Sequence, residues 1–433
     1  MRIALIITVL TLVLIPSLTF GEELPDPYSF GTVTVRIDGW AKENFILGFL
    51  AFDSEKTFAD VEALEEYLLK KKQQLVNKRL FREADITYSI SEEDEYKADV
   101  EIYVKDGAPV FFLPYYKYNS NYGHQFGCAV YLYDVFGTLT NLMIGGGYSA
   151  TSFDDDPHKK VDWDLNIEWD KIEFFNYTWD LNFRHRYMTT ELINYSTDEY
   201  EQFYKNYETS LTFSTGTRLF EYFSYSFKPS FKWNYGYHVV DGDVDTSTKL
   251  ISGLSHGLGY RKLNWTGNTR TGYSAGLGQG IGYDFFENKV NNELNIEYKA
   301  FYPWWIFQLS TAGKIHYNLM RDSIGTADKL RGILNSRTSG QFVFTENFDI
   351  STKLFTVPKV MDVRGGSFLD VGVMKRQDRA VQFPYFSAGI EGLFFPIAYK
   401  SLVIRGTFGM DLRALAEGKL NKWELEISQH LFY

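Results

Sequence analysis

The chain has 433 residues, a formal net charge of −11 and one cysteine, Cys128. The negative charge argues against a nucleic-acid partner, because binding to a phosphate backbone depends on lysine and arginine. A single cysteine excludes an intramolecular disulfide, and we expect Cys128 to be a buried or lipid-facing small apolar residue rather than a nucleophile. Aromatic residues make up 18% of the chain, an unusual share for a soluble enzyme.

The N-terminus has the pattern of an export signal. Arg2 gives it a positive charge, residues 3–14 are almost all apolar, and the small residues Thr19 and Gly21 fit a cleavage site. We therefore expect residues 1–21 to be a signal peptide, with an uncleaved membrane anchor as the alternative. A spanning helix needs ~20 apolar residues, and no later stretch approaches that length, which excludes a helical membrane protein.

Residues 28–107 differ from the rest and predict a small α+β domain in the order β-α-α-β-β. Between residues 60 and 81, apolar residues recur every three or four positions and are separated by Glu and Lys, as in an amphipathic helix. The other predicted elements are a strand at 32–37, a short helix at 45–52, and strands at 84–90 and 98–104.

From residue 110 to 433 the sequence is strand-like. In 161–170, for example, Val161, Trp163 and Leu165 alternate with Asp162 and Asp164. Strand after strand has charges on one face and aromatic or aliphatic residues on the other. This pattern predicts a transmembrane antiparallel β-barrel of about sixteen strands with a wet lumen. A soluble β-sandwich or lipocalin-like barrel is the alternative.

The predicted connections alternate in length, as an outer-membrane barrel requires. An even number of strands places both barrel ends, and the small domain, on the side of the short turns. We expect that side to be the periplasm and the longer loops to face outward. The longest loop is 321–340, and the last two strands are expected at 401–415 and 422–433.

The final strand presents Leu425, Ile427, Leu431 and the terminal Tyr433 on one face. A terminal aromatic preceded by alternate apolar residues resembles the signal by which outer-membrane barrels are delivered to their assembly machinery. These four residues are therefore candidates for the barrel seam and its recognition signal.

Taken together, the chain resembles the outer-membrane assembly factors and surface antigens of the BamA/TamA type. The segment Asn77 to Phe81 leads into a strand as in their POTRA domains. The outer loop contains Leu330-Arg331-Gly332-Ile333, the next strand contains Asn347-Phe348-Asp349, and the one after it contains Asp370-Val371-Gly372. The order and spacing agree with the family. The resemblance implies one periplasmic POTRA domain followed by a sixteen-stranded barrel.

The side-chain pattern gives this motif a physical meaning. Alternation places Asp349 and Asp370 inside the barrel on neighbouring strands, where two carboxylates need a cation. A loop folded into the lumen can supply Arg331, whose guanidinium can bind carboxylates bidentately. Gly332 would allow close backbone approach. The alternative is a solvated Arg331 and two ordinary lumen charges.

Other motifs support no chemistry. A second Arg-Gly, at 363–365, is expected in a periplasmic turn and is set aside. The glycines of 276–282 lack the strand-turn-helix context of a nucleotide loop. In 184–186, the histidine should face away from both arginines, and the acidic run 154–156 is most simply a solvated loop tip, with a Ca²⁺ site as the alternative. We expect no catalytic residues, no metal and no cofactor.

The sequence thus predicts a non-enzymatic barrel in the bacterial outer membrane that inserts or translocates proteins, as the resemblance implies. Its expected partners are membrane lipid, unfolded client polypeptides, and accessory periplasmic proteins or lipoproteins. The alternative is a passive outer-membrane channel or a surface antigen with a structural role.

Overall fold

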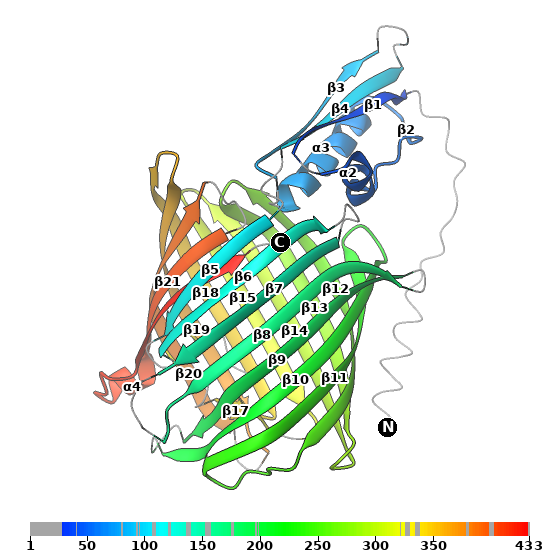
Figure 1. The fold of residues 1–433 in the computed structure, drawn as a ribbon. Coiled ribbons are helices and arrows are strands. Elements are labelled where there is room, and N and C mark those ends of the chain that lie inside the picture. Colours follow the sequence, from blue (N-terminus) through cyan, green and yellow to red (C-terminus); the bar gives the residue numbers. More distant parts are fainter. Residues whose placement is uncertain are drawn as a thin grey trace.

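The computed structural model describes residues 28–39, 41–78, 81–91, 94, 96–105, 110–119, 123–135, 140–151, 157–174, 177–194, 197, 199–320, 322–324, 330–333, 338–377, 381–397 and 402–431. These residues form a closed antiparallel barrel of sixteen strands, preceded by a small α+β domain (Figure 1). The predicted fold class and strand number are therefore confirmed. The predicted signal peptide lies outside the described residues, as does the acidic run 154–156.

The small domain consists of one four-stranded sheet and two helices. Its core contains the fully buried Ile46, Leu64 and Ile102. The sheet order is β2-β1-β4-β3, with β1 parallel to β4. The elements are β1 (Tyr28–Asp38), α2 (Glu43–Leu50), β2 (Thr57–Phe58), α3 (Val61–Lys78), β3 (Glu83–Ile90) and β4 (Lys97–Lys105).

This order adds only the two-residue β2 to the predicted β-α-α-β-β pattern. The 98–104 strand lies in the centre of the sheet as β4, whereas β3 forms one edge. The side of β1 that faces away from β4 pairs with β2 only at Tyr28 and Ser29.

Both helices have polar groups at an end. The carboxylate of Asp60 accepts a hydrogen bond from the backbone N–H of Ala63 at the start of α3, satisfying an otherwise unpaired helix donor. Lys71 of α3 donates to the carbonyl of Leu50 at 2.6 Å, at the C-terminus of α2. No helix among the described residues is long and apolar enough to cross a bilayer.

The barrel closes in chain order except that two short strands, β16 (Ser323–Ile324) and β17 (Ser339–Gly340), form a separate pair in the longest loop. The barrel strands are β5 (Val110–Asn119), β6 (Gly123–Val135), β7 (Thr140–Ala150), β8 (Val161–Phe174), β9 (Tyr177–Ile193), β10 (Tyr200–Arg218), β11 (Phe223–Asp241), β12 (Lys249–Thr266), β13 (Thr269–Asp284), β14 (Lys289–Trp304), β15 (Phe307–Asn318), β18 (Phe342–Val357), β19 (Met361–Lys375), β20 (Val381–Pro396), β21 (Leu402–Asp411) and β22 (Trp423–Leu431).

Alternation along the strands separates two faces. Leu165 and Trp169 of β8 are exposed on the outer face. On the lumen face, Arg186 of β9 and Lys232 of β11 both pair with Glu208 of β10, at 2.7 and 3.2 Å. A row of charged groups across three strands, backed by aliphatic and aromatic side chains, is the pattern of a membrane barrel with a polar interior.

The small domain and the shorter connections lie at the same end of the barrel (Figure 1). Helix α3 contacts the end of β12, beside its turn into β13: Asn77 accepts a hydrogen bond from the backbone N–H of Trp265 at 3.0 Å and donates to Asn264 at 3.1 Å. In the strand order, this turn lies opposite the junction of β22 and β5, where the barrel closes. The domain is thus fixed to the rim away from that junction.

Two sequence predictions about the last third of the barrel are wrong. The predicted strand 401–415 ends at Asp411, whose carboxylate accepts hydrogen bonds from the backbone N–H groups of Arg413 and Ala414 and starts helix α4 (Leu412–Ala416). A short-side-chain acceptor at this position favours a helix N-terminus over a continuing strand. Residues 363–365 lie within β19 rather than in a turn, and the turn comes at 358–360.

Candidate functional site

The candidate site is a short segment of the longest loop, residues 330–333, which lies inside the barrel. Leu330 and Ile333 are 2% and 3% exposed and pack with Val343, Met374 and Tyr385 of the surrounding strands. These wall residues occupy lumen-facing positions that elsewhere in the barrel are polar. The loop is therefore held by apolar burial as well as by charge.

Arg331 is the centre of the site and binds both predicted aspartates. Its Nε donates to Oδ2 of Asp370 at 2.9 Å and its Nη2 donates to Oδ1 at 2.5 Å, which is a bidentate pair. Its Nη1 donates to Oδ1 of Asp349 at 2.6 Å, and its backbone N–H also donates to Asp370 at 2.9 Å. The structure thus brings together the three charged residues that the motif singled out.

The strand register explains how one guanidinium reaches both acids. Asp349 of β18 lies directly opposite Phe368 of β19, and Asp370 is two residues further along β19 on the same face. The guanidinium carbon of Arg331 lies 3.8 Å from the centre of the Phe368 ring. The cation therefore stacks on the ring between the two carboxylates, an arrangement that suits the planar arginine side chain.

Burial strengthens these contacts. The Asp370 side chain is fully buried, and that of Arg331 is 15% exposed. Desolvation by itself would lower the pKa of Arg331, but the hydrogen bond to Asp370 and the charges of Asp349 and Asp370 outweigh it and raise the pKa. Arg331 therefore stays charged at any physiological pH.

Two further carboxylates belong to the site and were not predicted from the sequence. Glu391 of β20 lies 3.5 Å from Arg331 and is bound more closely by Arg405, at 2.6 Å. Glu424 of β22 accepts a hydrogen bond from the backbone N–H of Gly332 at 2.8 Å. Charged lumen residues occur on many strands, so no sequence signal distinguished these two. The sequence did contain one indication that the loop packs here, because Val343 is an apolar residue on an otherwise polar strand face.

The glycines of the motif make room for the loop. Gly332 has φ +88°, and a Cβ there would lie 2.7 Å from the carbonyl carbon of Gly409 in β21. A Cβ on Gly372 would lie 2.6 Å from Cδ1 of Leu330. The first contact is with backbone and cannot relax easily, whereas the second is with the end of a flexible side chain. Gly332 is thus required by both conformation and space.

The second candidate feature is the seam between β22 and β5. Within the described strands, pairing across it is confined to Glu426 with Asn119 and Ile427 with Tyr118. The hairpin of β5 with β6, by contrast, pairs along the whole of β5. An ion pair between Lys117 and Glu426, at 3.2 Å, adds a side-chain link across the seam. Among the neighbouring barrel strands, this junction has the fewest paired positions that the described residues show.

The predicted C-terminal residues are only partly described. Leu425 lies opposite Phe408 in the register, and Ile427 is exposed on the outer face. The Leu431 side chain and Tyr433 lie outside the described residues, so the proposed recognition signal stays a prediction.

At the end of the barrel away from the small domain, an ion pair crosses the mouth. Arg376 follows β19, and its Nη1 lies 2.9 Å from Glu201 of β10. Strands β10 and β19 are on opposite sides of the closed strand order. Arg376 is also 3.8 Å from Asp322 in the longest loop. Loops at this end of the barrel are therefore joined over the lumen.

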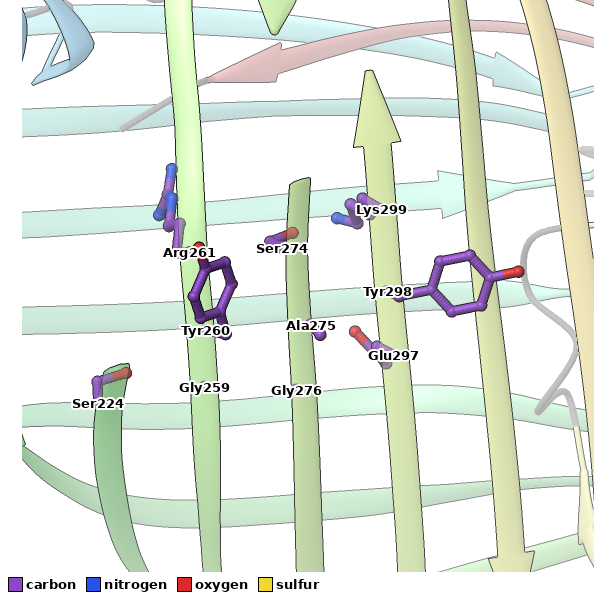
Figure 2. Close-up of a pocket in the computed structure, with 10 residues that line it drawn as sticks. All are labelled: Ser224, Gly259, Tyr260, Arg261, Ser274, Ala275, Gly276, Glu297, Tyr298 and Lys299. Carbon is purple, nitrogen blue, oxygen red and sulfur yellow. The ribbon is translucent and has the colours of Figure 1, made fainter. Parts of the chain in front are cut away.

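The glycines of 276–282 lie within strand β13, as expected for a wall element rather than a nucleotide loop. Together with Ser274 of the same strand and with Ser224 and Gly259 of β11 and β12, Gly276 lines a concavity of about 290 Å³ in the wall (Figure 2). His185 packs edge-on against Trp163, whereas its neighbour Arg186 pairs with Glu208 in the lumen. Cys128 is exposed on a barrel strand. In the described part of the chain, no cluster of three or more His, Cys, Asp or Glu residues could hold a metal.

The sequence matches no protein-family profile and no curated protein. Solved structures, however, share its fold. CdiB from Acinetobacter baumannii is similar with a TM-score of 0.64 at 12% identity, covering 94% of this chain and 74% of that one. CdiB from Escherichia coli gives 0.64 at 13% identity, covering 93% and 76%. BamA from Haemophilus ducreyi lacking POTRA domains 1–3 gives 0.52 at 13% identity, covering 93% and 84%.

Proposed function

We propose that this chain is an outer-membrane protein that inserts or translocates polypeptides, with the small domain as a periplasmic POTRA-like module. The observation that carries the proposal is the contrast between a weak seam and a braced wall. Within the part of the chain that the structure describes, β22 pairs with β5 at two positions, while Arg331 joins the longest loop to β18 and β19 elsewhere in the ring. A barrel built in this way can open at one junction without unfolding.

The similarity in fold to BamA and CdiB supports this proposal, as does the match of the 330–372 motif to the BamA/TamA pattern. The position of the small domain relative to the barrel is also consistent with this proposal. The small domain lies at the end with the short connections, which in outer-membrane barrels faces the periplasm. The outer mouth, by contrast, is crossed by the Arg376–Glu201 ion pair, which does not favour a freely open channel.

A disulfide across the seam tests the opening. In a Cys128→Ser background, Tyr118→Cys with Ile427→Cys joins residues that lie opposite each other on β5 and β22. We expect oxidation to stop client insertion or secretion and reduction to restore it. The matched control is Tyr116→Cys with Phe126→Cys, which joins opposite residues of the β5–β6 hairpin and should be harmless. Full activity with the seam oxidised would exclude lateral opening.

A second experiment tests client binding to the small domain. An extended segment can add to a free sheet edge, and β3 is such an edge. A photo-crosslinker at Thr87 of β3 should trap unfolded barrel proteins, whereas one at Glu101 should trap far less. Glu101 lies directly opposite Thr87 on the central strand β4, so the two probes share a face and differ in distance from the edge. Robust ion conductance, together with crosslinking at Thr87 that stays at the background level seen at Glu101, would favour the alternative of a passive channel.

A further inference from the structure

A carboxyl group lies on the outer face of the barrel, where the neighbouring side chains are apolar. Glu346 of β18 alternates in phase with Phe344 and Phe348, and Phe348 is 48% exposed. Glu346 itself is only 7% exposed. If the barrel spans a membrane, as proposed above, this acid faces the lipid side of the wall, where an unpaired polar group is costly.

The carboxyl group is enclosed by residues from two preceding strands. Tyr298 of β14 donates its hydroxyl hydrogen bond to Oε2 of Glu346, and the hydroxyl of Thr311 in β15 donates to Oε1. Both carboxyl oxygens therefore have a partner within the wall. The contacts link three successive strands, β14, β15 and β18, on their outer face.

A glycine makes this link possible. Tyr298, Gly313 and Glu346 lie directly opposite one another across the three strands. The Tyr298 ring extends from β14 over the next strand, as Figure 2 shows, and passes above Gly313. A Cβ on Gly313 would be 2.2 Å from the Tyr298 ring and 2.6 Å from Oε2 of Glu346. Any other residue at 313 would thus separate the tyrosine from the acid.

The position of the Glu346 contacts in the chain indicates which strand pair they stabilise. Elsewhere, short turns connect most neighbouring strands and fix their register, but β15 and β18 are separated by residues 319–341. This pair has no tight turn at its outer end. The lumen face is held by Arg331 and Asp349, and the outer face carries the Glu346 contacts three residues earlier on the same strand.

We propose that Glu346, Tyr298, Thr311 and Gly313 form a register pin on the outer face of the barrel, which fixes β18 against β15 and β14. A slip of one residue would turn Glu346 into the lumen, and a slip of two would move it beyond the reach of both hydroxyls. Because hydrocarbon offers no competing water, these hydrogen bonds keep their full strength. The pin keeps this part of the wall closed, so that movement is confined to the seam.

Disulfide trapping in the membrane-inserted protein tests the pin. In a Cys128→Ser background, Ile315→Cys with Phe344→Cys reports the native register, because these residues are directly opposite. Ile315→Cys with Phe342→Cys reports a slip of two residues. We expect the parent and Glu346→Gln, which keeps hydrogen-bonding capacity, to form the native disulfide. Glu346→Leu should lower the ratio of native to slipped product by about tenfold, because it removes both hydrogen bonds. Gly313→Ala should lower the ratio less, because the added Cβ displaces Tyr298 from Oε2 and leaves the contact between Thr311 and Oε1.

Tyr298→Phe keeps the ring over Gly313 and removes one hydrogen bond, so it should give an intermediate ratio and remain foldable if Glu346→Leu does not assemble. An unchanged ratio in Glu346→Leu, or in Tyr298→Phe if only that variant folds, would overturn the proposal. The readout uses no client, so failure of the proposed transport function would leave it intact. Conversely, loss of the pin would not by itself argue against transport.

Discussion

Removing Arg331 provides the most direct test of the loop latch, which we propose to hold residues 330–333 in the lumen. Arg331→Ala deletes three side-chain hydrogen bonds and leaves the fully buried Asp370 without its counter-charge. Breaking a buried charge pair costs ~3–5 kcal/mol, because the remaining charge is uncompensated. The Asp349 side chain is 21% exposed and can regain some water. We therefore expect a loss in the lower half of that range, ~3–4 kcal/mol.

The assay is urea unfolding of the barrel in lipid vesicles, followed by tryptophan fluorescence and by the heat-dependent change in gel mobility. Arg331→Lys keeps the charge without the bidentate geometry, so its loss should be smaller. Adding Asp370→Asn to Arg331→Ala should recover part of the stability, because the buried negative charge is removed. The matched control is Arg413→Ala, since Arg413 of α4 pairs at 3.3 Å with the exposed Glu417, which follows the helix. Its loss should stay below ~1 kcal/mol.

Two results would refute the latch. The first is an Arg331→Ala barrel whose unfolding midpoint equals that of Arg413→Ala. The second is strict additivity of Arg331→Ala and Asp370→Asn, because residues in direct contact should show a coupling free energy of at least ~0.5 kcal/mol.

Three further predictions follow from the loops. Gly332→Ala should destabilise the barrel more than Gly418→Ala. Both glycines have positive φ, but only at Gly332 would an added Cβ collide with backbone atoms. Equal unfolding midpoints in urea would contradict this steric argument. Arg376→Ala should increase ion conductance in planar bilayers by untying the outer mouth from Glu201, and unchanged conductance would show that other contacts close it. In the loop 242–248, the backbone N–H of Ser247 donates to Asp245 and lowers the pKa of this carboxyl group. The ionised carboxylate therefore stabilises the loop at a pH above its ordinary pKa of ~3.9, and this stabilisation is lost as the pH falls below that value. The difference in amide-exchange protection between the parent and Asp245→Asn should therefore shrink below that pH, and a constant difference would argue against the assigned cause.

Much of the architecture follows from periodicity alone. The period of two beyond residue 110 reflects strands with one apolar and one polar face, and each strand can be located without its neighbours. The same holds for α3, where apolar residues recur at helical spacing. Asp349 and Asp370 could be assigned to the lumen because each follows the phase of its own strand.

Predictions failed where a local signal competed with the pattern. Leu412 continues the alternation of β21, but Asp411 caps the next backbone N–H groups and the chain turns into α4. The position of the predicted 98–104 strand within the small sheet also could not be read from the sequence. This strand lies in the middle of the small sheet, because β1 pairs with it in parallel, and sheet order is set by long-range pairing.

What only the tertiary structure decided is how residues distant in sequence meet. Sequence alone could not show that Arg331 stacks on Phe368 and shares the lumen with Glu391 and Glu424, because these residues come from four separate elements. Nor could it show that Glu346, a carboxyl group on the apolar face of β18, is enclosed by Tyr298 and Thr311. Alternation fixes the face to which a side chain points, but the register between strands fixes its neighbours, and register emerges only when the barrel closes.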